Sequence, residues 1–264
     1  MNNPGSWTAD RNSADLSTMA DGWLGIGGNL GDVRKSIEEA CRLLESQEIR
    51  IVGRSRMWLT QPVGTAAGEE PFLNAALHVA TDRSPHDLLH TLHRAEERLG
   101  RIRDRHWGSR KIDIDLLLYD DVLRDDPELR IPHPGVVYRR FVLDPLNEIA
   151  ADLKHPGCGR TIAELLARLK VRPLPVILAD GTDDDREQIS ALIAEHFSGS
   201  ICTSSPHESA DPTVIRIEDP MTENTVTQPP GSEISVRIDQ IDGPVTDAVF
   251  AVLTAMTDEP RPAD

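Results

Sequence analysis

The hydrophobic and polar positions of the first 170 residues follow two periods, one typical of strands and one typical of helices. The strand-like stretches are residues 23–28, 49–60, 72–81 and 111–119. The helix-like stretches are residues 33–47, 85–101 and 161–170, with a shorter helix expected within 127–150. Asp32 and Ser84 stand where N-caps belong, and Pro85 suits a first helical position. The order β-α-β-β-α-β predicts an α+β fold of the ferredoxin-like kind, an antiparallel sheet with helices on one face.

The pattern changes after residue 172 and predicts a small C-terminal α/β appendage. Its expected strands are 174–180, 212–219 and 233–242, and its expected helices are 183–197 and 245–256. Two polar stretches separate these elements. We therefore expect four parts, which are a disordered tail at 1–20, a main folded domain at 21–172, the acidic appendage at 173–258 and a disordered end at 259–264.

Composition limits the class of protein. A hydrophobic content of 39% over 264 residues supports a folded core. The chain has no apolar run long enough for a transmembrane helix, and its first residues lack the pattern of a secretory signal. Its three cysteines are scattered without metal-type spacing. We therefore expect a cytoplasmic protein with reduced thiols and no membrane association.

The charge is unevenly distributed. The net charge is −16, of which −3 belongs to residues 1–170 and −13 to residues 171–264. Seven basic residues nevertheless fall between Arg94 and Lys111. Such a cluster suggests a polyphosphate ligand, whereas the overall negative charge argues against nucleic acid.

Asp113 and Asp115 interrupt the apolar stretch 111–119. Residues two apart in a strand share a face, so the two carboxylates lie side by side. Two interpretations remain open on this stretch alone. The strand could simply have one solvated face, or the pair could hold a divalent cation such as Mg2+, which binds through one or two carboxylates together with substrate phosphates.

Other polar and aromatic residues gather around this stretch in the sequence. Glu96 and several arginines precede it, Trp107 offers a flat face for a heterocycle, and His133 stands in a proline-flanked turn. The glycine-rich segment 25–32 matches neither phosphate-binding glycine motif, and we interpret it as a strand-to-helix turn.

Four segments, in this order and spacing, closely resemble the family of 6-hydroxymethyl-7,8-dihydropterin pyrophosphokinase (HPPK) of folate biosynthesis. They are WLTQPVG, EEPFLNAAL, ERLGRIRDRHWGSRKIDIDLLLY and IPHPGVVYRRFVLDPLNEIA, and the resemblance covers about residues 22–170. It implies an HPPK-like fold and an ATP-dependent diphosphokinase, a transferase. In this reaction the pterin hydroxymethyl oxygen attacks the β-phosphorus of ATP, pyrophosphate moves as a unit and AMP leaves.

The resemblance also assigns roles to individual residues. It implies that Asp113 and Asp115 bind two Mg2+ ions that bridge the ATP phosphates, and that Arg103 and Arg110 are the catalytic basic residues. The positions implied for the nucleotide are Glu96, Arg103, Trp107, Arg110, Leu116, His133 and Arg139. Those implied for the reduced pterin are Thr60, Val63, Phe72, Asn74, Trp107 and Phe141, with Phe72 and Phe141 as the aromatic pair around the ring. The chain departs from the family pattern at Gly28, Phe72, His93, Ser109 and Glu128.

Two other functions compete with this expectation. A nucleotidyltransferase also carries an Asp-x-Asp pair, but there the glycine turn precedes the pair by roughly a dozen residues, whereas here the two are far apart in sequence. A protein that only binds pterin or nucleotide would leave the appendage as the working part. In either case the appendage could dock a protein partner or mediate self-association.

Overall fold

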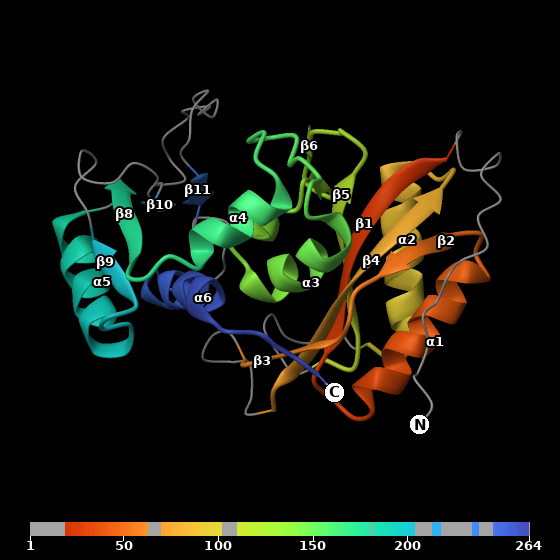
Figure 1. Cartoon of the computed structure of the whole chain (residues 1–264), viewed down its shortest axis with the longest axis horizontal. Helices are drawn as coiled ribbons and strands as arrows, with labels where there is room; N and C mark the ends of the chain where they lie inside the picture. The colour runs from red at the N-terminus through yellow and green to blue at the C-terminus, as the bar shows by residue number, and fades with distance from the viewer. Residues whose placement is uncertain are drawn as a thin grey trace.

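The structure is a computed structural model that describes residues 19–62, 70–101, 110–180, 182–203, 213–217, 234–237 and 245–263. It contains a larger antiparallel sheet with helices on both sides and a smaller parallel sheet at one end (Figure 1). Within these residues no helix is long and apolar enough to cross a membrane.

The larger sheet has the strand order β12-β3-β4-β1-β5, with β2 also paired to β4. Its strands are β1 (Ala20–Gly28), β2 (Arg50–Arg54), β3 (Trp58–Thr60), β4 (Phe72–Thr81), β5 (Asp113–Tyr119) and β12 (Arg261–Pro262). All the pairings are antiparallel, and β1 lies in the middle between β4 and β5. A short hairpin of β6 (Arg124–Asp125) and β7 (Arg130–Ile131) follows β5.

Helices cover both faces of this sheet, whereas the sequence predicted helices on one face only. Helix α1 (Val33–Glu45) and helix α2 (Pro85–Arg98) pack on one face, and their N-caps are Asp32 and Ser84 as predicted. Helix α3 (Arg140–Ala150) packs on the other face, and helix α4 (Ile162–Leu169) packs against it. The reason is that β4 and β5 bury apolar side chains on both faces.

The predicted strand 49–60 is two strands, β2 and β3. The register between β2 and β4 shifts between Ile51 and Gly53, and the ladder stops at Ser55. The Ser55 hydroxyl there accepts a hydrogen bond from the Ala76 backbone, and Arg56 binds Glu148 of α3 through its backbone amide and its guanidinium. This break changes the direction of the chain, so that β3 pairs with the first residues of β4.

A similar irregularity changes the faces of β5. The register with β1 shifts between Trp23 and Leu24, and Leu118 consequently packs with α3 rather than with α1 and α2. Side chains along β5 therefore alternate between the two faces through Leu117, whereas Leu118 and Tyr119 lie on the faces opposite to those that regular alternation would give. Asp113 and Asp115 precede the shift and share one face, as the sequence predicted.

The C-terminal part contains a parallel sheet of order β11-β10-β8-β9. Its elements are β8 (Leu174–Asp180), α5 (Asp183–His196), β9 (Ile201–Thr203), β10 (Thr213–Ile217), β11 (Ile234–Arg237) and α6 (Val245–Thr257). Strand β9 lies in a stretch that the sequence pattern assigned to no element, because three residues are too few to show alternation.

Helix α6 and the residues after it return to the larger sheet. Apolar side chains of α6, including Val249, Leu253 and Met256, belong to the same core cluster as those of α3 and α4. The predicted disordered end at 259–264 is wrong for Arg261–Pro262, which form β12 against β3. The partners of β12 are backbone groups of β3. Because β3 is distant in sequence, the local pattern could not predict this pairing.

Candidate active site

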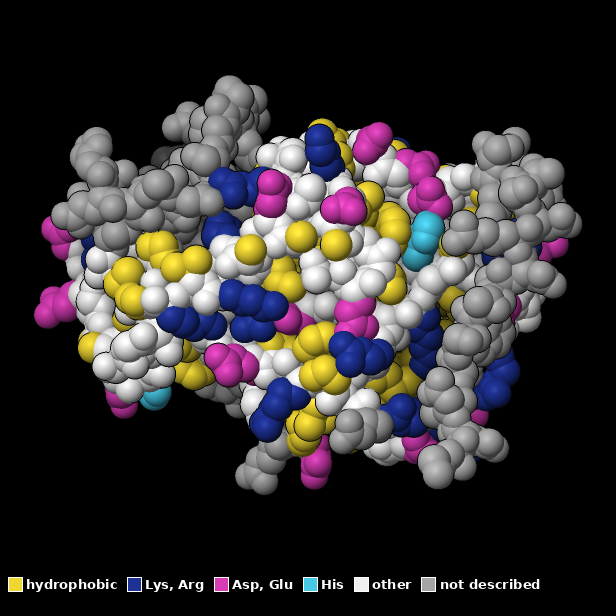
Figure 2. Space-filling model, viewed as in Figure 1, with side chains coloured by type: hydrophobic (Ala, Val, Ile, Leu, Met, Phe, Trp, Pro, Cys, Tyr) yellow, Lys and Arg dark blue, Asp and Glu magenta, His cyan; other side chains and the backbone are white. Residues whose placement is uncertain are grey.

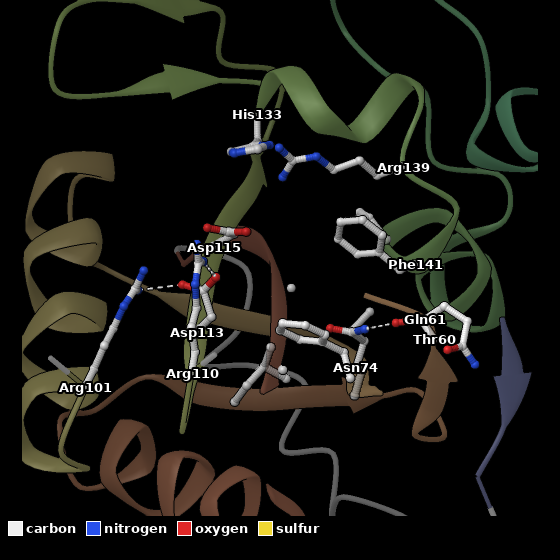
Figure 3. Close-up of a pocket in the computed structure, with 17 residues that line it drawn as sticks. Thr60, Gln61, Asn74, Arg101, Arg110, Asp113, Asp115, His133, Arg139 and Phe141 are labelled. Carbon is white, nitrogen blue, oxygen red and sulfur yellow. Dashed lines mark hydrogen bonds and ion pairs between the residues drawn. The ribbon is translucent and has the colours of Figure 1, made fainter. Parts of the chain in front are cut away.

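A cavity of about 320 Å³ lies on the face of the larger sheet that α3 covers. The residues around it come from β1, β3, β4 and β5, from the residues after α2 and before β5, and from α3 and the segment that leads into it. In Figure 3 the carboxylates and arginines stand at one end, whereas Thr60, Gln61 and Asn74 stand at the other. Phe141 lies above Asn74, on the same side as Thr60 and Gln61.

Two glycines of β1 form the floor of this cavity. Gly27 pairs with Asn74 on one side and with Asp113 on the other, and Gly25 pairs with Asp115. Asn74 and Asp113 are therefore two strand spacings apart, about 10 Å. A Cβ atom at Gly27 would lie 2.1 Å from the Asn74 amide oxygen, so the close approach of Asn74 requires glycine there.

The carboxylate end carries both acids and bases. Asp113 forms ion pairs with Arg101 and Arg110, and Asp115 lines the cavity on the same face of β5. Burial, followed by the negative charge of Asp115, raises the pKa of Asp113 above its usual value, and the arginines oppose this. Within the described part of the chain, no three His, Cys, Asp or Glu side chains are grouped to hold a metal ion. A cation at this pair would therefore complete its ligand shell with other oxygens.

Glu96 of α2 holds both β5 and Arg101 in position. Its carboxylate is buried in α2, accepts a hydrogen bond of 2.7 Å from the Ile114 backbone amide and pairs with Arg101. Burial raises the pKa of Glu96 to about 7, although Arg101 opposes the shift. This contact explains how α2 holds the strand that carries both aspartates.

His133 and Arg139 lie above the carboxylates and point toward one another (Figure 3). Both flank the 3₁₀ helix η2 (Pro134–Val137), whose N-cap is His133. The His133 Nδ1 atom accepts a hydrogen bond of 3.0 Å from the Gly135 amide, which leaves Nε2 as the donor of the neutral ring. Burial and the charge of Arg139 lower the His133 pKa to about 3, so the ring is neutral at physiological pH.

The opposite end offers a polar edge and aromatic faces. The Asn74 amide donates a hydrogen bond of 2.9 Å to the Thr60 hydroxyl, which aligns β3 and β4. Phe72 and Phe141 are half-buried and line the same cavity. This combination suits a flat heterocycle that carries donors and acceptors along one edge.

A second cavity of about 350 Å³ adjoins the first. Arg101, Asp115 and His133 line both cavities, so the carboxylate end opens toward each of them. The second cavity is also lined by Leu116, His93 and Glu128. A ligand with two chemically distinct ends could therefore extend from one cavity into the other.

The structure brings most of the predicted site residues together. Those that line one or both cavities are Thr60, Phe72, Asn74, Arg110, Asp113, Asp115, Leu116, His133, Arg139 and Phe141. Glu96 lies beneath them without lining either cavity. Val63, Arg103, Trp107 and Ser109 lie outside the described residues.

Sequence reasoning gave Asn29 and Gln61 no role in the site. Asn29 accepts a hydrogen bond of 2.7 Å from the Arg110 amide and donates to the Glu70 carbonyl, so it ties the end of β1 to the residues just before β4 and β5. Its place in the segment 25–32 was the only available signal. Gln61 lines the first cavity directly after β3.

Comparison with known proteins points to one family. The profile of the 7,8-dihydro-6-hydroxymethylpterin-pyrophosphokinase (HPPK) family matches residues 23–151. A 2-amino-4-hydroxy-6-hydroxymethyldihydropteridine pyrophosphokinase of Methylorubrum extorquens is 42% identical over 152 residues, which are 57% of this chain and 94% of the relative. The protein of the same description from Pseudomonas aeruginosa is 39% identical over 55% of this chain and 89% of its own length.

Similarity to solved structures is lower. A wild-type HPPK-DHPS of Plasmodium falciparum aligns with a TM-score of 0.43 at 13% identity, over 76% of this chain and 64% of that protein. The chain thus spans about two thirds of the solved protein it matches.

Proposed function

This chain belongs to the 7,8-dihydro-6-hydroxymethylpterin-pyrophosphokinase family, and from that premise we propose that the cavity beside Asp113 and Asp115 is its active site. The protein transfers pyrophosphate from ATP to 6-hydroxymethyl-7,8-dihydropterin in folate biosynthesis, which yields AMP and the pterin pyrophosphate. The observation that carries the site assignment is one cavity with paired carboxylates at one end and an amide edge with aromatic rings at the other.

Asp113 and Asp115 would hold two Mg2+ ions together with the phosphates of ATP. Their fit is supported by hard oxygen ligands on one strand face, at a place where two guanidinium groups already balance negative charge. When bound, Mg2+ neutralises the charge that develops on the transferred phosphates and on the leaving AMP.

The arginines of this end bind and orient the phosphates. Arg110 now pairs with Asp113, and a phosphate oxygen would compete for the same guanidinium once the aspartate faces a cation. The family resemblance assigns Arg103 the same kind of role, and it places Trp107 between nucleotide and pterin. Little covalent chemistry is required of the protein, because orientation and charge stabilisation supply most of the catalysis.

The nucleotide would occupy the second cavity and extend toward the carboxylates. Leu116 offers an apolar contact there, and His133 presents its Nε2 donor where the two cavities meet. Arg139 faces the shared region from above, and Glu96 holds Arg101 and the backbone of Ile114 in place. His93 and Glu128, which depart from the family pattern, line this second cavity.

The pterin would lie at the other end of the first cavity. Asn74 can donate and accept at once, and it is aligned by Thr60. Phe72 and Phe141 would sandwich the ring, with Val63 nearby as the resemblance implies. This pose directs the hydroxymethyl group toward the carboxylate end, where the β-phosphorus of ATP must lie.

The wider organisation is part of the same proposal. The strand order of β3, β4, β1 and β5 and the positions of α1 and α2 support a ferredoxin-like arrangement in residues 21–172. Residues 173–258 would form the acidic appendage, suited to a protein partner or to self-association. The reaction itself uses ATP and a reduced pterin and requires no nucleic acid.

The reaction type and the metal role can be tested in one assay. Purified protein, MgATP and 6-hydroxymethyl-7,8-dihydropterin are mixed and the nucleotide product is identified. We expect pterin-dependent AMP that is lost in Asp115→Ala and retained in Asp121→Ala, an exposed aspartate just after β5. ADP would indicate a simple kinase, pyrophosphate release would favour a nucleotidyltransferase, and binding without turnover would favour a binding protein.

A further inference from the structure

The last described residues, 258–263, form a segment that we call the C-terminal segment, and it lies against β3. Arg261 pairs with Leu59 and Pro262 with Trp58, and the Ala263 amide donates a hydrogen bond of 2.7 Å to the Met57 carbonyl. The segment therefore adds a strand to the sheet on the outer side of β3.

The other end of the C-terminal segment is held as well. The Arg172 guanidinium donates to the Thr257 carbonyl at 3.4 Å, and Pro260 is buried. Asp258 is partly buried, which raises its pKa, and the backbone amides of Glu259 and Gln61 partly offset this shift. The segment thus contacts the chain from Met57 to Gln61 at several points.

This stretch of chain carries part of the proposed pterin site. Thr60, the last residue of β3, binds Asn74, and Gln61 follows it directly. Gln61 lines the active-site cavity and also a cavity of about 630 Å³ beside the C-terminal segment. Figure 2 shows basic side chains, with acidic ones among them, over the region between α6 and β3 where this segment runs.

Strand β3 needs such support, because it is only three residues long. Its inner side pairs with β4, but its outer side has backbone groups that would otherwise face water. A short strand with one neighbour frays easily, and fraying would move Thr60 relative to Asn74.

We propose that the C-terminal segment is a positioning element for the pterin site, which holds β3 in register so that Thr60 and Gln61 keep their places in the cavity. The inference rests on the proposed function. In this proposal backbone contacts hold β3 in place. The side chain of Arg261 is exposed, and Arg261 pairs with Leu59 through the main chain.

Two single substitutions separate the backbone contact from side-chain effects. Ala263→Pro removes the amide that binds the Met57 carbonyl, whereas Ala263→Ser keeps it. Deletion of residues 259–264 removes the whole pairing and leaves α6 intact. Arg261→Ala serves as a further control, since it leaves the backbone pairing in place.

The measurement is the steady-state rate of AMP formation with pterin and ATP varied separately, together with the melting temperature. We expect Ala263→Pro to raise the KM for pterin about fivefold, the effect of one misplaced hydrogen bond, and the deletion to raise it further. The KM for ATP and the melting temperature should change little, and both control variants should match the wild type.

A rise in both KM values together would mean a general loss of structure and would overturn the proposal. Unchanged kinetics in the deletion variant would overturn it as well. If the unmodified chain itself makes no AMP, the proposed function fails instead, and the two failures are therefore distinguishable.

Discussion

At the scale of single residues, the closest fit in the active site is that between Gly27 and Asn74. Any side chain at position 27 must displace the Asn74 amide, because the Cβ atom would lie 2.1 Å from its oxygen. We expect Gly27→Ala to raise the KM for pterin about ten- to a hundredfold while Mg2+ and ATP binding change much less. Kinetics with each substrate varied check this.

The matched control is Gly53→Ala in β2, where a new Cβ atom would meet only the His78 Cβ at 3.5 Å. It should leave the KM values unchanged. An equal loss in both variants would mean that strand glycines matter for stability rather than for the pterin site.

His155 gives a prediction about pH. Its side chain is buried, which lowers its pKa from 6.5 to about 4, and Nδ1 accepts hydrogen bonds from the amides of Gly157 and Cys158. The unfolded chain therefore binds a proton on this residue at a higher pH than the folded chain does. As the pH falls from 6.5 to 4, the free energy of unfolding should decrease by about 3 kcal/mol from this group.

We expect His155→Asn, which keeps an acceptor but does not titrate, to flatten that dependence. Denaturant unfolding at pH 7, 5.5 and 4.5 measures it, with His90→Asn on the exposed side of α2 as the control. His133 titrates in the same direction in all three proteins, so the difference between them isolates His155. Parallel curves for wild type and His155→Asn would contradict the assignment.

The sequence predicted several residues that line the candidate cavity, but not the contacts between them. The spacing of Asp113 and Asp115 placed both on one face because local strand geometry decides it. The link from Asn29 to Arg110 could not be predicted, since it joins positions 81 residues apart and depends on how two segments meet. The same holds for Gly27, because its need for glycine arises from the register with β4, which brings Asn74 and the Leu73 carbonyl close to it.

At the scale of helices and strands, capping signals located α1 and α2, because the capping contact is made within a few residues. The bulges in β2 and β5 and the pairing of β12 were not predictable in this way. They depend on partners distant in sequence, such as Glu148 for Arg56. The placement of α3 on the second face of the sheet was missed for the same reason.

Helix α3 depends on a buried ion pair. Arg140 binds Asp144 through two hydrogen bonds of 2.9 and 3.2 Å, both side chains are almost fully buried, and Lys170 of the chain after α4 lies 3.6 Å from the same carboxylate. Asp144→Ala would leave the Arg140 guanidinium buried without its carboxylate. We expect a loss of about 3 kcal/mol or more in the free energy of unfolding.

Denaturant titration measures this loss, and the control is Asp152→Ala at an exposed position just after α3. The control should stay within about 0.5 kcal/mol of the wild type. If Asp144→Ala were equally mild, the pair would contribute little to holding α3 against the sheet.

At the scale of the whole molecule, the C-terminal third is acidic in composition but continuous with the catalytic core. Side chains of α6 share one apolar cluster with α3 and α4, so a chain that ends at Arg172 would expose that surface to water. We expect such a truncation to lower the melting temperature by about 10 °C or more and to increase binding of a hydrophobic dye.

Thermal unfolding of the full and truncated chains checks this expectation. A truncated chain with the same melting temperature and the same rate of AMP formation would mean that residues 21–172 are self-sufficient. The appendage would then act only through partners or self-association.

The contact of residues 261–263 with β3 also affects where another sequence can be fused to the protein. Because the Ala263 amide is bound to the Met57 carbonyl, any sequence fused after Asp264 starts next to strand β12, which pairs with the strand that carries Thr60. A purification tag or reporter placed there could crowd the substrate or pull the segment away. A fusion at that position is therefore best avoided in kinetic work and in ligand screening.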